Sequence, residues 1–216
     1  DYAEYLLTLL QKHGVRMSVC QFREQCDGRI IAEHGKDGEE VLSAHDCLER
    51  MLYHDGVDTS ACAKLCHREL FQTVRSPKGK LFEDIGTTYA LMLQCDRIAV
   101  GNASKYVYRL RRDSIVNASF HPGKMDLLEM TDRMAKDVAA AFPDLKDAVL
   151  RRQVYARFST INQMLNTDGY ERERGEMISY VKRHRGEVLR NPRTPKRDRI
   201  ALVLISVSYR LYRRMW

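Results

Sequence analysis

Apolar residues fall every three or four positions at the start of the chain. Gly14 follows this pattern as a stop signal, so we predict a helix over residues 1–13. Residues 39–54 repeat the spacing and predict a second helix. The chain thus begins at Asp1, inside a predicted helix, and we interpret it as part of a longer protein.

Other stretches have the patterns of strands. Residues 15–22 are apolar on both faces, which is typical of a central strand in a covered sheet. The Asp27-Gly28 turn that follows predicts a hairpin with the next short run. Residues 97–111 predict one or two strands, whereas residues 61–71 follow neither period and are interpreted as extended or irregular.

Beyond Phe120 every pattern is helical. The expected helices cover residues 124–142, 144–165, 171–190 and 199–216. We therefore predict an α+β fold, mainly helical, in which a mixed sheet with helices is followed by an all-helical C-terminal region. The expected divisions are residues 1–120, residues 121–190, and a Pro- and Arg-containing linker with a basic terminal helix over residues 191–216.

The positive charge of the chain is concentrated near its C-terminal end. The net charge is +7, from 36 Lys/Arg and 29 Asp/Glu. Residues 182–216 hold 11 of the basic and 2 of the acidic residues, which leaves 25 and 27 in residues 1–181. A nucleic-acid-binding protein would carry a basic face on its folded body. We therefore exclude nucleic-acid binding as the main function.

The cysteines favour a cytosolic protein with reduced thiols. The chain has 6 of them, without the spacing of a disulfide framework, and most have apolar neighbours. Cys62, Cys66 and His67 form a weak zinc-like group, because no second Cys/His pair lies nearby. We predict no metal in this chain.

A pair of adjacent carboxylates, Glu83 and Asp84, lies where a helix is expected to begin, after a Pro-x-Gly turn at Pro77. Acids in a first helical turn complement the helix dipole, each by roughly 0.3 to 1 kcal/mol. Carboxylates held at such a place also suit acid–base chemistry. The pattern alone leaves both interpretations open.

Alternation near the end of the last predicted strand places Tyr106 and Tyr108 on one face, and Arg109 and Arg111 on the other. Neighbouring guanidinium groups repel each other unless an anion lies between them, and Arg binds phosphate or carboxylate through two hydrogen bonds. The strand therefore predicts an anion-binding pair. The alternative is a solvated edge strand whose arginines pair with acids elsewhere in the fold.

The terminal segment carries an apolar stretch, residues 200–209, between basic residues. The residues expected to contact a membrane are Arg199, Arg210, Arg213, Arg214 and Trp216. Ten residues make roughly 15 Å of helix, about half of a bilayer core, so the stretch is too short to span it. It can lie in an anionic membrane interface or dock on the protein body. The expected location is cytoplasmic, peripheral to the inner face of the plasma membrane.

The motifs in order resemble the acceptor-side half of bacterial family 2 glycosyltransferases, which have the GT-A fold. The likeness covers about residues 1–120 and rests on Lys64-Leu65, Pro77-x-Gly79-Lys80, Glu83-Asp84 and Tyr108-Arg109-x-Arg111-x-x-Ser114-Ile115. The family usually has Trp and Tyr around the Lys-Leu pair, where this chain has Cys62 and Cys66.

This resemblance implies a partial GT-A-like sheet and an inverting sugar transfer in cell-envelope or exopolysaccharide synthesis. The donor would be a nucleotide sugar, and the acceptor a hydroxyl of a glycan or lipid-linked molecule. It assigns the general base to Asp84, with Glu83 beside it, because a positioned carboxylate can take the proton that the attacking hydroxyl loses. It assigns substrate binding to Lys64, Arg109, Arg111 and Ser114.

The family's nucleotide-binding N-terminal half, with its Asp-rich metal motif, has no counterpart in residues 1–216. We therefore expect no transferase activity from this chain alone, no cofactor bound to it, and a Mg²⁺ or Mn²⁺ ion only in the full-length enzyme. Exposed sheet edges would favour a homodimer. The competing hypothesis is a noncatalytic helical interaction or membrane-docking module, in which Asp84 only caps a helix.

Overall fold

The computed structural model describes residues 1–111, 114 and 118–215. It divides into two compact units. Asp1–Gly79 and Glu83–Ala118 form the first, which we call the sheet unit, and Lys80–Phe82 and Ser119–Trp216 form the second, which we call the helical unit. Helices cover more than half of the chain, so the predicted α+β class is confirmed. Within the described ranges no helix is long and apolar enough to cross a membrane.

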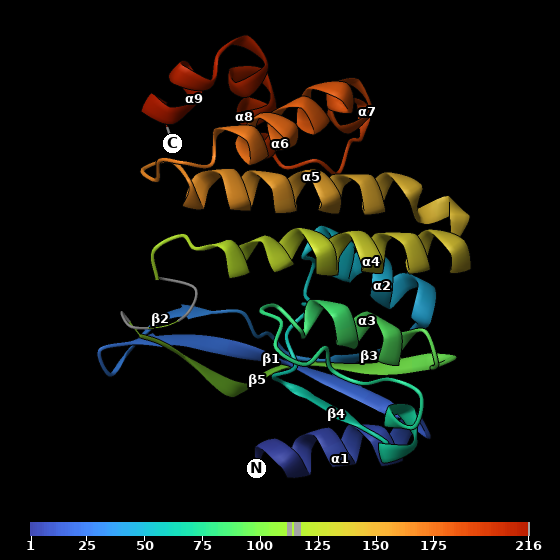
Figure 1. The fold of residues 1–216 in the computed structure, drawn as a ribbon. Coiled ribbons are helices and arrows are strands. Elements are labelled where there is room, and N and C mark those ends of the chain that lie inside the picture. Colours follow the sequence, from blue (N-terminus) through green and yellow to red (C-terminus); the bar gives the residue numbers. More distant parts are fainter. Residues whose placement is uncertain (112–113, 115–117, 216) are drawn as a thin grey trace. The chain divides into compact units, whose positions relative to one another are not determined.

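The sheet unit is built on a mixed sheet (Figure 1). Its strands are β1 (Met17–Cys26), β2 (Arg29–Glu33), β3 (Glu39–Ser43), β4 (Lys64–Cys66) and β5 (Arg97–Leu110). The order is β2-β1-β5-β3, with β4 also paired to β1. β1 and β5 are parallel, and the other pairs are antiparallel.

Strand β1 is central, as its two apolar faces predict. It has β5 on one side and both β4 and β2 on the other, along successive parts of its length. Helix α1 (Tyr2–His13) covers one face of the sheet and ends at Gly14, which has a φ of 61°. Helices α2 (Ala44–Tyr53) and α3 (Ile85–Met92) cover the other face (Figure 1). The first half of β1 is therefore buried.

β5 is a single strand that continues through Gly101. Its register against β1 shifts just after this glycine, since Val19 lies opposite Val100 but Gln21 lies opposite Ser104. A Cβ atom at Gly101 would be 2.6 Å from the Leu9 side chain and closer still to that of Tyr5. Glycine is required here because α1 lies directly against the strand.

The prediction of one helix over residues 39–54 was wrong in its first part. Glu39–Ser43 is strand β3, with Val41 opposite Ala99 of β5. The helix begins only after Ser43, whose hydroxyl accepts a hydrogen bond of 3.0 Å from the Asp46 N–H. A serine in this role marks the position before the first helical residue.

The helical unit consists of α4 (Asp126–Ala141), α5 (Lys146–Gln163), α6 (Glu171–Arg183), α7 (Arg185–Arg190), α8 (Lys196–Val207) and α9 (Tyr209–Met215). The helices predicted over residues 171–190 and 199–216 are each divided in two, at His184 and at Ser208. Helix α5 packs against α4 on one side and against α6 and α7 on another. This double contact explains why α5 carries two apolar stripes, one with Ala148 and Val149 and the other with Val154, Phe158 and Ile161.

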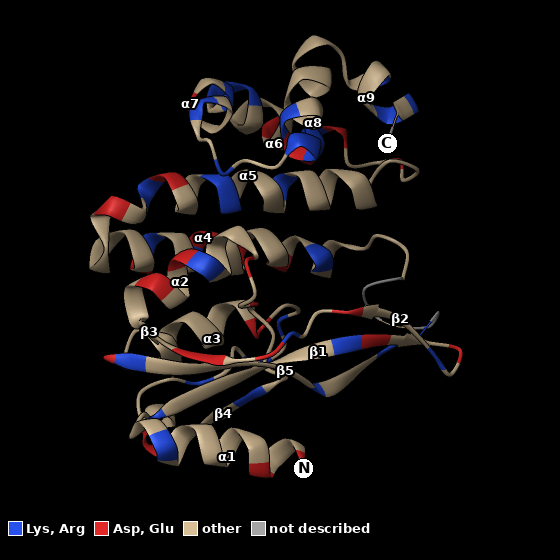
Figure 2. Ribbon diagram, turned by 180° about the vertical axis from the view of Figure 1, so that it is seen from behind, with Lys and Arg blue, Asp and Glu red and all other residues tan. Residues whose placement is uncertain are grey.

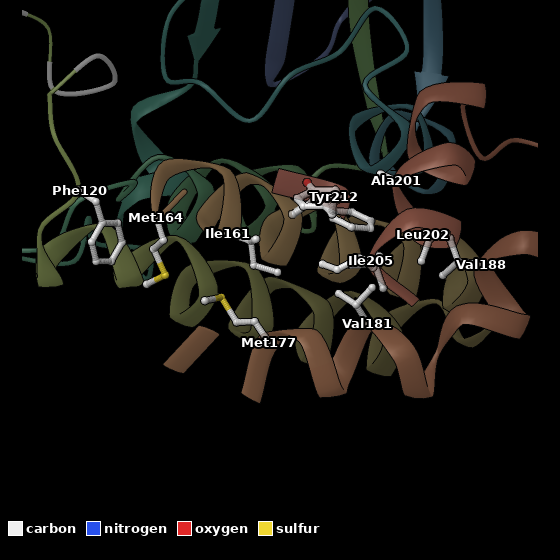
Figure 3. Close-up of a cluster of buried hydrophobic side chains, with 12 residues drawn as sticks. Phe120, Ile161, Met164, Met177, Val181, Val188, Ala201, Leu202, Ile205 and Tyr212 are labelled. Carbon is white, nitrogen blue, oxygen red and sulfur yellow. The ribbon is translucent and has the colours of Figure 1, made fainter. Parts of the chain in front are cut away.

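An apolar cluster forms the core of the helical unit (Figure 3). Its members are Phe120, Val154, Phe158, Ile161, Met164, Met177, Val181, Val188, Ala201, Leu202, Ile205 and Tyr212. Leu202 and Ile205 of α8 are fully buried in it. The Tyr212 hydroxyl of α9 lies 2.5 Å from the Asn162 side-chain oxygen and donates to it. One face of the terminal segment is thus docked on the other helices of this unit.

Candidate functional site

A cavity of about 280 Å³ in the sheet unit contains three of the predicted site residues. Lys64 comes from β4, and Glu83 and Asp84 precede α3. The rest of the lining is Met17, Ala61, Leu65, Cys66, Phe71, Ser76, Thr87, Thr88 and Leu91. The cavity therefore combines an apolar floor with two carboxylates and several hydroxyl groups.

Asp84 is held at the N-terminus of α3 by its backbone. Its carbonyl accepts hydrogen bonds from the N–H groups of Thr88, at 2.8 Å, and Thr87, at 3.1 Å. One carboxylate oxygen accepts a bond of 2.8 Å from the Ile85 N–H. The second carboxylate oxygen has no hydrogen-bond donor among the described residues. Capping therefore occupies only part of this side chain and leaves an acceptor for a ligand.

The surroundings of Asp84 make it a stronger base than an ordinary aspartate. Burial raises the pKa of its carboxyl, and the nearby carboxylates of Glu83 and Asp58 act in the same direction. The Ile85 N–H and the charge of Lys64 lower the pKa, but less than burial raises it. A raised pKa brings a carboxylate closer to the value that suits proton transfer near neutral pH.

Lys64 is committed to an ion pair inside the protein. Its Nζ lies 2.5 Å from Asp58 Oδ1, and its side chain is only 4% exposed. The Asp58 carboxylate also accepts from the Ser60 hydroxyl at 3.0 Å. Lys64 thus holds Asp58 and the loop around it in place, and does so at the edge of the cavity.

Asp58 was missed in the sequence because it stands alone in an irregular stretch. The only signal is its place six residues before Lys64, within reach of a lysine that opens a short strand. It lines a second cavity, of about 200 Å³, with Phe22 and Glu24 of β1 and Tyr106 and Tyr108 of β5. Ser60 and Cys62 complete the lining. The ion pair between Asp58 and Lys64 therefore links two cavities of the sheet unit. The first contains Glu83 and Asp84, and the second, which we call the aromatic cavity, is lined by aromatic rings.

Backbone strain occurs at two points beside these residues. Ala63, directly before Lys64, and Phe82, directly before Glu83, each have a φ of 57°. A side chain makes this left-handed conformation unfavourable, and such residues gather at functional sites. Asp27 and His54 share the conformation, but they occupy a hairpin turn and a helix C-cap, where it is common.

The predicted anion-binding arginines, Arg109 and Arg111, lie outside the cavity that contains Asp84. Arg109 lies on β5 opposite Gln25, and Arg109 and Arg111 are both exposed. Neither residue lines either of the two cavities. Ser114 is half-buried, and its N–H donates to the Arg111 carbonyl at 3.3 Å. Ile115, the last residue of this motif, lies outside the described residues.

The described residues offer no ligand set for a metal ion. Across residues 1–111, 114 and 118–215, no group of three or more His, Cys, Asp or Glu side chains is placed to hold one. The six cysteines are all free thiols.

Among the predicted membrane contacts, Arg199 is used inside the fold. Its guanidinium donates to the carbonyls of Thr194, Leu189 and Asn191, at 3.0, 2.8 and 2.6 Å. The Leu189 carbonyl lies in the last turn of α7 and the other two follow its end, so Arg199 caps that helix. The other three arginines, Arg210, Arg213 and Arg214, are exposed on α9. Trp216 lies outside the described residues.

With this geometry established, the chain was compared with known proteins. No protein-family model matches it, and no curated protein matches it.

Proposed function

We propose that this chain is the acceptor-side part of an inverting glycosyltransferase. It would bind an acceptor hydroxyl for attack on a sugar that a nucleotide donor carries, in cell-envelope or exopolysaccharide synthesis. The observation that carries the proposal is the position of Asp84. It is a half-buried carboxylate with a raised pKa and one oxygen left without a donor in the described residues, and it lines a cavity with Glu83 and Lys64.

Asp84 acts as the general base in this proposal. The acceptor hydroxyl donates its hydrogen bond to the available carboxylate oxygen, and its proton moves to Asp84 as the oxygen attacks the anomeric carbon. The bond between that carbon and the leaving diphosphate breaks as the new bond forms. Glu83 assists Asp84, because its neighbouring carboxylate helps to keep the pKa of Asp84 raised.

The aromatic cavity supplies a second part of an acceptor site. Phe22, Tyr106 and Tyr108 present ring faces and edges, and Glu24 and Asp58 provide acceptors beside them. Sugars bind to such surfaces by packing their C–H faces on rings, and their hydroxyl groups donate hydrogen bonds to carboxylates. Arg109 and Arg111 keep the role implied by the resemblance, binding of the donor diphosphate or of an anionic acceptor.

The test is sugar transfer by the intact protein that carries this chain, with a panel of nucleotide-sugar donors and radiolabelled product. We expect Asp84→Asn to lower kcat by about 10²- to 10⁴-fold, with little change in the KM for the acceptor, because only proton transfer is lost. Lys64→Met should instead raise the KM for the acceptor, because it releases Asp58.

Asp96→Asn is the matched control, since Asp96 is an exposed carboxylate of the same unit outside both cavities. This variant should keep normal turnover. Normal turnover in Asp84→Asn, with the fold intact by circular dichroism, would remove Asp84 as the base.

A further inference from the structure

The exposed side of the terminal helices carries apolar side chains at regular spacing. On α8, Ile200, Val203 and Val207 are 53%, 50% and 71% exposed, and their separations of three and four residues place them in one stripe. On α9, Leu211 and Met215 are 40% and 62% exposed and lie one turn apart. We call the stripe of Ile200, Val203 and Val207 the apolar face. Scattered exposed apolar residues are ordinary, but an ordered stripe on a helix is not.

This apolar face is distinct from the one that docks on the protein. Leu202 and Ile205 of the same helix are fully buried in the helical unit. Helix α8 is therefore apolar on two sides, of which one is covered within the unit. Helices that are apolar on both sides are typically contacted on both sides.

Basic residues accompany the apolar face. Lys196 and Arg197 are exposed at the start of α8, and Arg210, Arg213 and Arg214 are exposed on α9 (Figure 2). The one acid between residues 196 and 215 is Asp198, and its carboxylate binds the buried Arg151 at 2.8 Å. Every exposed charged side chain among the described residues of α8 and α9 is thus positive.

We propose that the apolar face docks this protein on an anionic lipid membrane, with α8 lying in the plane of the headgroups. Ile200, Val203 and Val207 enter the boundary of the acyl chains, and the arginines of α9 bind lipid phosphates. Free phosphate or a nucleotide would satisfy the arginines but not the apolar side chains. A second copy of the chain would cover the apolar side chains but bring two positive surfaces together. Only an anionic interface suits both.

Two groups of residues take no part in this membrane docking. Arg199 is bound to three backbone carbonyls and stays in the fold, although its position in the sequence suggests a membrane contact. Docking of this kind does not depend on the proposed transfer reaction, since it uses none of the cavity residues.

The experiment is flotation of the chain with vesicles of phosphatidylcholine alone or with about 30 mol% phosphatidylglycerol. We expect binding only to the anionic vesicles, weakened when NaCl is raised from about 0.05 M to about 0.5 M. Val203→Ser with Val207→Ser should weaken binding by roughly tenfold or more, because the transfer of two apolar side chains is lost. Arg213→Gln with Arg214→Gln should weaken it by roughly 30-fold, at about 1 kcal/mol for each charge.

The matched control is Ile30→Ser with Ile31→Ser. These residues of β2 are 47% and 57% exposed, so a comparable pair of exposed apolar side chains is removed from another part of the chain. This variant should bind like the wild type, and all variants should keep the wild-type circular dichroism spectrum. Absence of vesicle binding, equal binding to neutral vesicles, or equal loss in the β2 control would each overturn the proposal. Self-association that disappears in the Val203/Val207 variant, without vesicle binding, would assign the face to a dimer instead.

Discussion

Buried ion pairs of the helical unit differ from Asp84 of the sheet unit in how completely they are paired. In the helical unit, Arg157 binds Asp132 through two bonds of 2.7 and 2.8 Å, and Arg151 binds Asp198 at 2.8 Å. These pairs join helices and line neither of the two cavities described above. In the sheet unit, Asp84 is half-buried beside a cavity with one oxygen left for a ligand. Burial of charge does not by itself point to function, and the incomplete pairing of Asp84 at a cavity is the reason that it is proposed as the base.

Backbone conformation distinguishes the surroundings of the cavity from the helical core. Ala63 and Phe82, both with positive φ, adjoin the cavity residues Lys64 and Glu83. Among the described residues from 119 to 215, only Gly169 has a positive φ. The helices of that range are held by an apolar core without such strain. We therefore expect substitutions in the helical core to act on stability, and those near the cavity to act on function.

The largest effect on stability should come from the core of the helical unit. Leu202→Ala removes a fully buried side chain and should lower the free energy of unfolding by about 2–5 kcal/mol. The adjacent Val203→Ala removes a side chain that is 50% exposed and should change it by less than about 0.5 kcal/mol. Urea unfolding followed by circular dichroism measures both. Equal effects at the two neighbours would mean that α8 is not docked as described.

Two glycines should respond to the same substitution with opposite signs. Gly101→Ala places a Cβ against Leu9 and Tyr5 and should cost about 1–3 kcal/mol. Gly175→Ala lies in α6 with no atom within 4 Å of the new Cβ, so it should stabilise by about 0.5–1 kcal/mol. Thermal unfolding of the two variants checks the contrast. A stabilising Gly101→Ala would contradict the close approach of α1 to β5.

The smallest effect concerns the pH dependence of stability. Because burial raises the pKa of Asp84 in the folded chain, folding favours its protonated form. The stabilisation that the protonated Asp84 carboxyl gives to the folded chain is fully present below the ordinary pKa of an aspartate. It is lost as the pH rises through the raised pKa of the folded chain. Asp84→Asn should therefore unfold at a higher temperature than the wild type at about pH 7, and the difference should disappear at about pH 3.

Asp96→Asn, at an exposed position, controls for the general loss of a negative charge and should follow the wild type over this range. A lower unfolding temperature for Asp84→Asn at neutral pH would show that the carboxylate mainly stabilises the helix. The capping interpretation would then be preferred over the catalytic one.

Part of the site could be predicted from local sequence. The turn before Glu83 and the apolar spacing after it are sufficient to place Asp84 at a helix start. Its neighbours in space could not be predicted in this way. Asp58 reaches the Lys64 side chain from an irregular loop, and no periodicity marks it.

The errors in the fold have the same origin. Residues 39–43 have spacing that suits a helix, but their partner strand lies in residues 97–101, far along the chain, and pairing with it decides the outcome. The sequence predicts a surface cation at Arg199, but in the fold its guanidinium binds the carbonyls at the end of α7. In each case the deciding contact is distant in sequence, so composition and periodicity do not contain it.

The parallel pairing of β1 with β5 has a consequence for how the chain folds. Ser18 lies opposite Ala99, so the centre of the sheet cannot close until the last strand is available. The helical unit relies largely on contacts between helices that follow one another in sequence, such as α4 with α5 and α8 with α9. Long-range parallel pairing is slow and local helix packing is fast. During synthesis, β1 must therefore wait with one edge unpaired until β5 emerges from the ribosome.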